Sequence, residues 1–179
     1  MKKYITILFV FGAFLLTNEV SAQKFAKLQK SPTDIAYAKT DRSAKPTIKV
    51  IYSRPQKKGR DIFGALVPYG KVWRTGADEA TEIKLTQDYN LGGTTVKAGT
   101  YSLFSIPGEK EWTIILNSDL DSWGAYSYDE SKDVARITVP AGSAESAIEA
   151  FGIGFKAVDK GYHLVMGWDN TVVEVPFYN

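Results

Sequence analysis

Arginines, aromatic residues and carboxylates are concentrated in one stretch of the chain, residues 52 to 81. Arginine binds carboxylate, sulfate or phosphate through a planar fork of donors, and Tyr or Trp rings offer flat faces for stacking. The glycines and prolines between these residues would fix their directions in turns. We therefore predict a ligand-binding site formed by seven residues: Arg54, Arg60, Tyr69, Trp73, Arg74, Asp78 and Glu79.

The same stretch also fits a purely structural role, and the sequence leaves both roles open. Trp73 would then fill the core, while Arg74 would hold a loop by donating to backbone carbonyls. Lys57 and Lys58 are expected on a solvated hairpin loop, whereas the two arginines that flank them are predicted to occupy fixed positions.

Most familiar catalytic and metal sites need residue types that this chain lacks or nearly lacks. It has no cysteine and one histidine, His163, which lies in an alternating run and is expected on a partly exposed strand. No Gly-x-Ser-x-Gly pattern is present, and zinc normally takes several His or Cys ligands. We assign no catalytic residue, no metal site and no cofactor.

One short segment has the spacing of oxygen ligands. Asn117, Asp119 and Asp121 alternate, as in a calcium-binding loop. Ser122 and Tyr128, however, stand where such a loop needs Gly and Glu. A polar β-turn is the predicted structure.

Glycoside hydrolysis requires two carboxylates whose spacing is spatial rather than sequential. The sequence offers several candidates and singles out no pair among them: Asp78, Glu79, Asp129, Glu130, Asp133 and Asp169.

The first residues have the order of an export signal. Lys2 and Lys3 precede an apolar run from Ile5 to Leu16, and small residues ending at Ala22 follow. We predict cleavage near Ala22, so that the mature protein begins at residue 23 and is periplasmic or extracellular. The apolar run is shorter than the roughly 20 residues of a membrane-spanning helix, so no stable membrane anchor is expected. With a formal net charge of +2, the chain gives no electrostatic reason to expect a nucleic-acid partner.

Short alternating or β-branched runs separated by turn residues recur about every ten residues and predict strands. They are Thr47–Ser53, Thr81–Thr86, Thr94–Lys97, Tyr101–Ile106, Trp112–Asn117, Val134–Val139, Ala150–Ala157, Tyr162–Trp168 and Thr171–Phe177. Among the separators are Pro140-Ala141-Gly142 and Asp169-Asn170. The predicted fold is all-β, an antiparallel β-sandwich or partly closed barrel with little helix.

One domain is expected over residues 46–179, preceded by an N-terminal arm at 23–45 and the signal peptide at 1–22. Ser31–Asp34 is interpreted as a turn or a helix cap. Ser143–Ala150 fits either a helical turn or the start of a strand.

Three further tryptophans are sorted by their surroundings. Trp112 and Trp168 lie in strand-like runs and are assigned to packing, whereas Trp123 lies in a turn-rich segment and is expected to reach the surface.

The polar stretch contains Tyr52-x-Arg54-Pro55, Gly59-Arg60 and the block Trp73-Arg74-Thr75-Gly76-Ala77. Further along follow Ala98-Gly99-Thr100-Tyr101-Ser102-Leu103-Phe104, Trp123-Gly124 and Trp168-Asp169. Together these residues resemble an exported bacterial family catalogued as domain of unknown function 2911, from about Ser31 to Phe177. The resemblance implies a compact exported domain and brings no established reaction. The family pattern usually has Asn at the position of Asp78. In this chain a carboxylate, which only accepts hydrogen bonds, therefore replaces an amide, which both donates and accepts them.

Three functions follow as hypotheses. The first is a non-enzymatic binding domain with an arginine- and aromatic-lined pocket for a small anionic or saccharide-like ligand. The second is a carboxylate-dependent hydrolase acting on glycans or other envelope material, and the third is a structural envelope subunit. The scarcity of histidine and cysteine favours the first over most enzyme classes.

Overall fold

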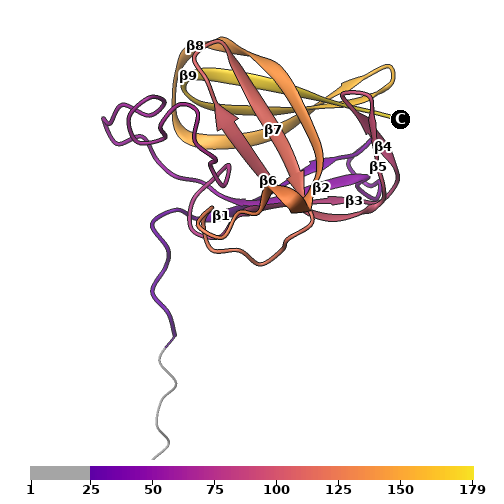
Figure 1. Cartoon of the computed structure of the whole chain (residues 1–179), viewed down its shortest axis with the longest axis horizontal. Helices are drawn as coiled ribbons and strands as arrows, with labels where there is room; N and C mark the ends of the chain where they lie inside the picture. Colours follow the sequence, from indigo (N-terminus) through magenta and orange to yellow (C-terminus); the bar gives the residue numbers. More distant parts are fainter. Residues whose placement is uncertain (1–24) are drawn as a thin grey trace, which may run out of the picture.

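The computed structural model describes residues 25–179 and contains one antiparallel sheet of nine strands (Figure 1). The strands are β1 (Thr33–Ala38), β2 (Ile48–Ser53), β3 (Thr81–Leu85), β4 (Tyr89–Leu91), β5 (Thr94–Val96), β6 (Gly99–Pro107), β7 (Glu111–Asn117), β8 (Asp133–Val158) and β9 (Gly161–Tyr178). A 3-10 turn, η1 (Glu130–Lys132), precedes β8. The predicted all-β class is confirmed.

The strand order is β1-β2-β3-β6-β7-β8-β9-β4-β5, and the two long strands fold this sheet into a sandwich-like shape. The first part of β8 pairs with β7 up to Pro140, and the rest of β8 pairs with β9. Figure 1 shows β8 and β9 arching over the layer that holds β1, β2 and β3. Apolar side chains from both layers meet between them and form the core.

Five aromatic rings form the part of the core that lies next to the candidate site. They are Phe63, Trp73, Trp112, Phe151 and Trp168. The rings of Trp73 and Trp168 stack with centroids 6.0 Å apart, and Trp73 also meets Phe151 edge to face at 5.2 Å. The assignment of Trp112 and Trp168 to packing is confirmed, since they are 2% and 1% exposed, and Trp123 is 59% exposed, as expected.

The structure differs from the predicted strands in two ways. It contains β1 and β4, which the sequence did not predict. Ser31 is a bend, whereas Thr33 and Asp34, interpreted as part of a turn or a helix cap, are the first residues of β1. β8 also runs without interruption through Ser143–Ala150, which therefore belongs to a strand and not to a helical turn. It likewise runs through Pro140–Gly142, where a turn was predicted and where β8 changes its partner from β7 to β9. In the same way Asp169 lies inside β9 with a φ of +53°, which marks a local irregularity in the strand.

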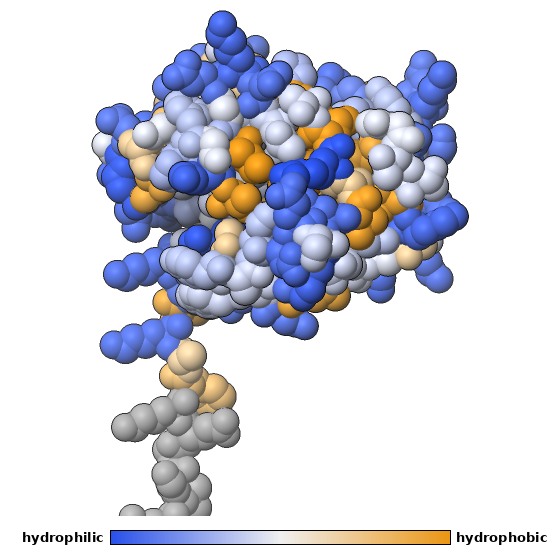
Figure 2. Space-filling model, in the orientation of Figure 1, coloured by the Kyte–Doolittle hydropathy of each residue, from blue (hydrophilic) through white to orange (hydrophobic). Residues whose placement is uncertain are grey.

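The surface in Figure 2 carries scattered apolar patches among hydrophilic side chains. Among residues 25–179, no helix has the length and apolar character needed to cross a membrane. The predicted signal peptide at 1–22 and its cleavage site before residue 23 lie outside the described residues.

Gly161 in the β8–β9 hairpin gives a test of this topology. Its φ is +142°, and a Cβ there would collide with the backbone oxygen of Phe177 on β9. We expect Gly161→Ala to lower the free energy of unfolding by about 2–3 kcal/mol, from backbone strain plus the collision. Gly93 is the matched control, because its φ is +90° but nothing lies within 4 Å of its Cβ position. Gly93→Ala should cost about 1 kcal/mol in urea unfolding; equal losses for both variants would argue against this hairpin.

Candidate functional site

A pocket of about 450 Å³ opens where the 52–81 stretch meets the N-terminal segment and β9. Its polar lining includes four cations, Lys30, Lys58, Arg60 and Arg74, and one carboxylate, Asp78. Trp73 and Trp168 add aromatic surface to the wall. The described part of the lining therefore carries an excess of positive charge next to aromatic rings.

The segment that carries Arg74 is held against β6. Trp73 and Ser105 exchange both backbone hydrogen bonds, at 2.7 and 2.9 Å. Thr75 is fully buried with a φ of +50°, and its hydroxyl lies 2.9 Å from that of Ser105. The hydroxyl of Thr81 donates to the Thr75 carbonyl at 2.7 Å. These bonds fix the backbone on both sides of Arg74, although the segment belongs to no strand.

The two tryptophans of the wall have their indole N–H groups paired. Trp73 Nε1 donates to the Gly76 carbonyl at 3.1 Å, and Trp168 Nε1 donates to the Glu149 carbonyl at 3.3 Å. Each ring is therefore held in one orientation by its packing and by a hydrogen bond.

The cations of the pocket differ in how they are held. Arg60 Nε donates to the Lys57 carbonyl at 2.9 Å, and a terminal nitrogen of Arg60 donates to Gln56. Arg74 Nε is buried and has no hydrogen-bond acceptor among the described residues. Nε has almost no exposed surface, so an anion in the pocket would have to be bound by the rest of the half-buried Arg74 side chain.

Asp78 has a left-handed backbone, with a φ of +60°, and its carbonyl accepts a hydrogen bond from Gly124 N–H at 3.1 Å. Asn and Asp are the non-glycine residues that adopt this conformation most readily. The backbone thus explains why either residue suits this position, whatever its side chain does.

Four of the seven predicted site residues line this pocket, namely Arg60, Trp73, Arg74 and Asp78. Trp73 fits both of the predicted roles, core packing and pocket lining, since it is a buried core residue that also lines the pocket. The other three are placed elsewhere, as the next paragraphs describe.

Arg54 lies in a separate, open groove. Its Nη1 pairs with Asp34 Oδ2 at 3.1 Å, and its Nε donates to the Phe151 carbonyl at 2.9 Å. Arg54 thus joins β1 to β8. This is a structural role of the kind that the sequence leaves open for Arg74.

Glu79 lines a separate, acidic pocket of about 210 Å³ together with Glu82 and Asp121. Tyr69 lines neither pocket; its ring lies over Gly64, where a Cβ would come within 2.7 Å of Tyr69 Cε2. The two acidic residues of the predicted site are therefore separated, with Asp78 in the cationic pocket of about 450 Å³ and Glu79 in the acidic one.

Sequence reasoning missed several lining residues. Lys30 comes from the segment interpreted as an arm, and Trp168 from a strand assigned to packing alone. Lys58 was expected on a solvated loop; it is exposed, yet it also lines the pocket. Lys57, by contrast, forms an ion pair with Asp169 at 2.8 Å. A bend before β1 places Lys30 at the pocket, and β9 places Trp168 there. No local sequence pattern predicts either contact, because both depend on segments that are distant in the chain.

The single histidine lies apart from the pocket, on β9. His163 Nδ1 is 2.8 Å from Glu174 Oε2, and this hydrogen bond holds the pKa of Glu174 below its usual value. Among residues 25–179, no group of three or more His, Asp or Glu side chains is arranged to hold a metal ion.

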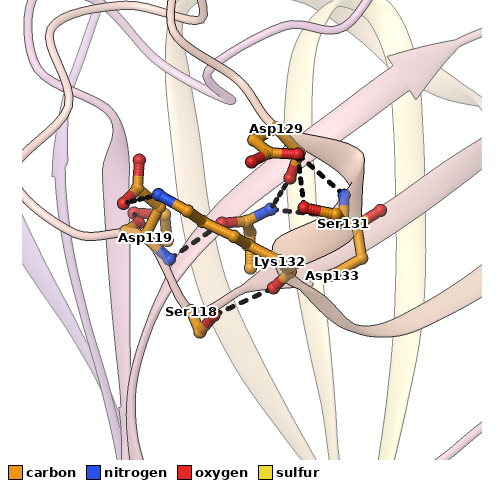
Figure 3. Close-up of polar contacts among 8 residues, drawn as sticks. Ser118, Asp119, Asp129, Ser131, Lys132 and Asp133 are labelled. Carbon is orange, nitrogen blue, oxygen red and sulfur yellow. Dashed lines mark hydrogen bonds and ion pairs between the residues drawn. The ribbon is translucent and has the colours of Figure 1, made fainter.

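The segment with calcium-like spacing begins at the end of β7 and continues as an irregular loop that is hydrogen-bonded to η1. Figure 3 shows Lys132 reaching Asp119, with an Nζ–Oδ1 distance of 2.7 Å, and Asp129 accepting from Ser131. Asn117, which is fully buried, donates through Nδ2 to the Asp129 carbonyl and to Asp133 Oδ1, at 2.9 and 2.7 Å. These partners belong to the protein itself, and the predicted β-turn is replaced by a strand end and an irregular loop.

Asn117→Asp tests this loop, because it replaces a donor amide by a carboxylate facing Asp133. We expect the free energy of unfolding to fall by about 1–3 kcal/mol at pH 7, since a donor is lost and two negative charges meet. Repulsion raises the pKa of one carboxyl, so the loss should shrink as the pH falls from 7 towards 4 and that carboxyl becomes protonated. Urea unfolding of both proteins across this range is the measurement. A loss that is independent of pH would contradict the contact.

The comparisons with known proteins identify a family and nothing finer. Residues 31–177 match the model of a family described as "Protein of unknown function (DUF2911)". No curated protein matches the chain, and no solved structure matches it. Because the match covers most of the chain, the protein belongs to this DUF2911 family.

Proposed function

We propose that this is an exported, non-enzymatic binding protein whose pocket takes a small anionic ligand, an acidic sugar above all. The observation that carries the proposal is the charge of the pocket lining, in which Arg74 is one of four cations beside a single carboxylate among the described lining residues. A carboxylate, sulfate or phosphate supplies the acceptors that a guanidinium needs.

The rest of the lining supports an acidic sugar. Lys30, Lys58 and Arg60 add positive charge around the same space, and Leu66, which is 46% exposed, offers apolar surface beside the buried Trp73 and Trp168. Such a combination of charged and apolar groups suits a ligand with a charged end and a ring with an apolar face.

The lining favours binding over hydrolysis. Asp78 is the one carboxylate among the described lining residues, whereas glycoside hydrolysis ordinarily uses a pair. Export rests on the order of charged, apolar and small residues before residue 23.

A thermal-shift screen of the mature protein tests the proposal. The panel pairs uronic acids, sugar phosphates and sugar sulfates with their neutral parent sugars. Acidic members should raise the melting temperature through mass action while the neutral parents do not, and the shift should decrease as salt screens the charges. Stabilisation by neutral and acidic members alike would refute the role given to the cations.

A further inference from the structure

A second, shallow pocket of about 190 Å³ adjoins the first. It is lined by Val72, Trp73, Arg74, Ala125 and Tyr126. Trp73 and Arg74 also line the cationic pocket, so the two spaces share one wall. A ligand that contacts Arg74 in the first pocket would reach the second by crossing this shared wall.

Tyr126 gives the second pocket its aromatic surface. The side chain is 88% exposed, yet its ring rests on the backbone of Gly124, where a Cβ would come within 2.8 Å of Tyr126 Cε2. Gly124 has a φ of +69°, and its N–H donates to the carbonyl of Asp78 in the first pocket. The exposed Tyr126 ring thus packs on the backbone of Gly124, which is hydrogen-bonded to Asp78 of the cationic pocket.

The charges of the two pockets differ. The cationic pocket has four positive side chains, whereas the described lining of the second pocket has Arg74 as its one charged residue. A polyanion with a charge on every unit at high density, such as nucleic acid, would find cations at one end only. A sugar chain fits better, because a sugar unit presents an apolar face to an aromatic ring and needs no counter-charge there.

We propose that the ligand is an acidic oligosaccharide rather than a single acidic sugar. One acidic unit occupies the cationic pocket, Arg74 lies at the junction, and the next unit stacks on Tyr126. This inference rests on the proposed function and adds the length and the direction of the ligand.

Isothermal titration calorimetry with galacturonic acid, a trimer that links one galacturonic acid to two neutral sugar units, and a neutral glucose trimer tests the inference. The parent protein should bind the acidic trimer about tenfold more tightly than the acidic monomer, the size of effect expected from one added aromatic contact. Tyr126→Ala should remove that gain and leave the affinity for the monomer within about twofold. Trp123→Ala is the matched control, because Trp123 is also an exposed aromatic in this loop but lines neither pocket; it should leave both affinities unchanged.

The outcomes separate the two proposals. Equal affinities for monomer and trimer, or a trimer affinity that Tyr126→Ala leaves intact, would overturn the extended ligand and spare the acidic-sugar pocket. A neutral trimer that binds as tightly as the acidic one, or no binding of either acidic sugar, would overturn both. If Trp123→Ala, and not Tyr126→Ala, removes the higher affinity for the trimer, the assignment of the second sugar unit to Tyr126 is also overturned.

Discussion

Trp168→Ala is expected to lower the free energy of unfolding by about 3–5 kcal/mol, the range for removing a large aromatic side chain from a packed core. Trp168 is 1% exposed and stacks on Trp73 at 6.0 Å. It also meets Phe63 and Phe151, each with ring centroids 6.1 Å away, and its Nε1 donates to Glu149. Truncation would leave a cavity between these rings and the pocket.

Equilibrium unfolding in urea, followed by circular dichroism, measures this loss. Trp123→Ala is the control, since a 59% exposed side chain should change stability by no more than about 0.5 kcal/mol. Similar losses in the two variants would mean that Trp168 does not belong to the core.

Arg74→Ala is expected to weaken binding of an acidic sugar at least tenfold while leaving stability within about 0.5 kcal/mol of the parent. The small stability change follows because Arg74 Nε has no acceptor among the described residues, so its removal breaks no hydrogen bond there. The backbone on either side is held by Trp73, Thr75 and Thr81, whose hydrogen bonds do not use the Arg74 side chain.

Arg74→Lys separates charge from geometry. Lysine keeps the positive charge but lacks the planar fork, so we expect only part of the affinity to return. Calorimetry with galacturonic acid and urea unfolding of the three proteins give both quantities. A stability loss of several kcal/mol in Arg74→Ala, with affinity unchanged, would identify Arg74 as a structural residue.

The strands were predictable where side chains alternate, as in β2 and β3, because alternation reports directly on a half-buried sheet. β1 was not predictable in this way, because the small residues Ala36 and Ala38 occupy its buried positions and give little hydrophobic contrast with their neighbours. The continuity of β8 through Pro140 was hidden for another reason. Proline usually marks a turn or an edge, and here it marks the point where β8 exchanges one partner strand for another.

The site was partly predictable, since the density of arginine and aromatic residues identified the segment that builds it. The sequence could not tell Arg54 from Arg74, because their roles depend on partners distant in the chain. Arg54 has Asp34 and the Phe151 carbonyl within reach, whereas Arg74 Nε has no such acceptor among the described residues. Trp168 entered the site for the same reason, through the packing of β9 against a loop some ninety residues earlier in the sequence.

Nuclear magnetic resonance of the four tryptophan indole N–H groups, titrated with galacturonic acid, tests the central claim most directly. The indoles of Trp73 and Trp168 belong to the wall of the cationic pocket, whereas Trp123 lies outside it. The account predicts that the Trp73 and Trp168 resonances shift on binding and that the Trp123 resonance stays in place. Binding that shifts Trp123 alone, or that leaves Trp73 and Trp168 unchanged, would contradict a ligand site in this pocket.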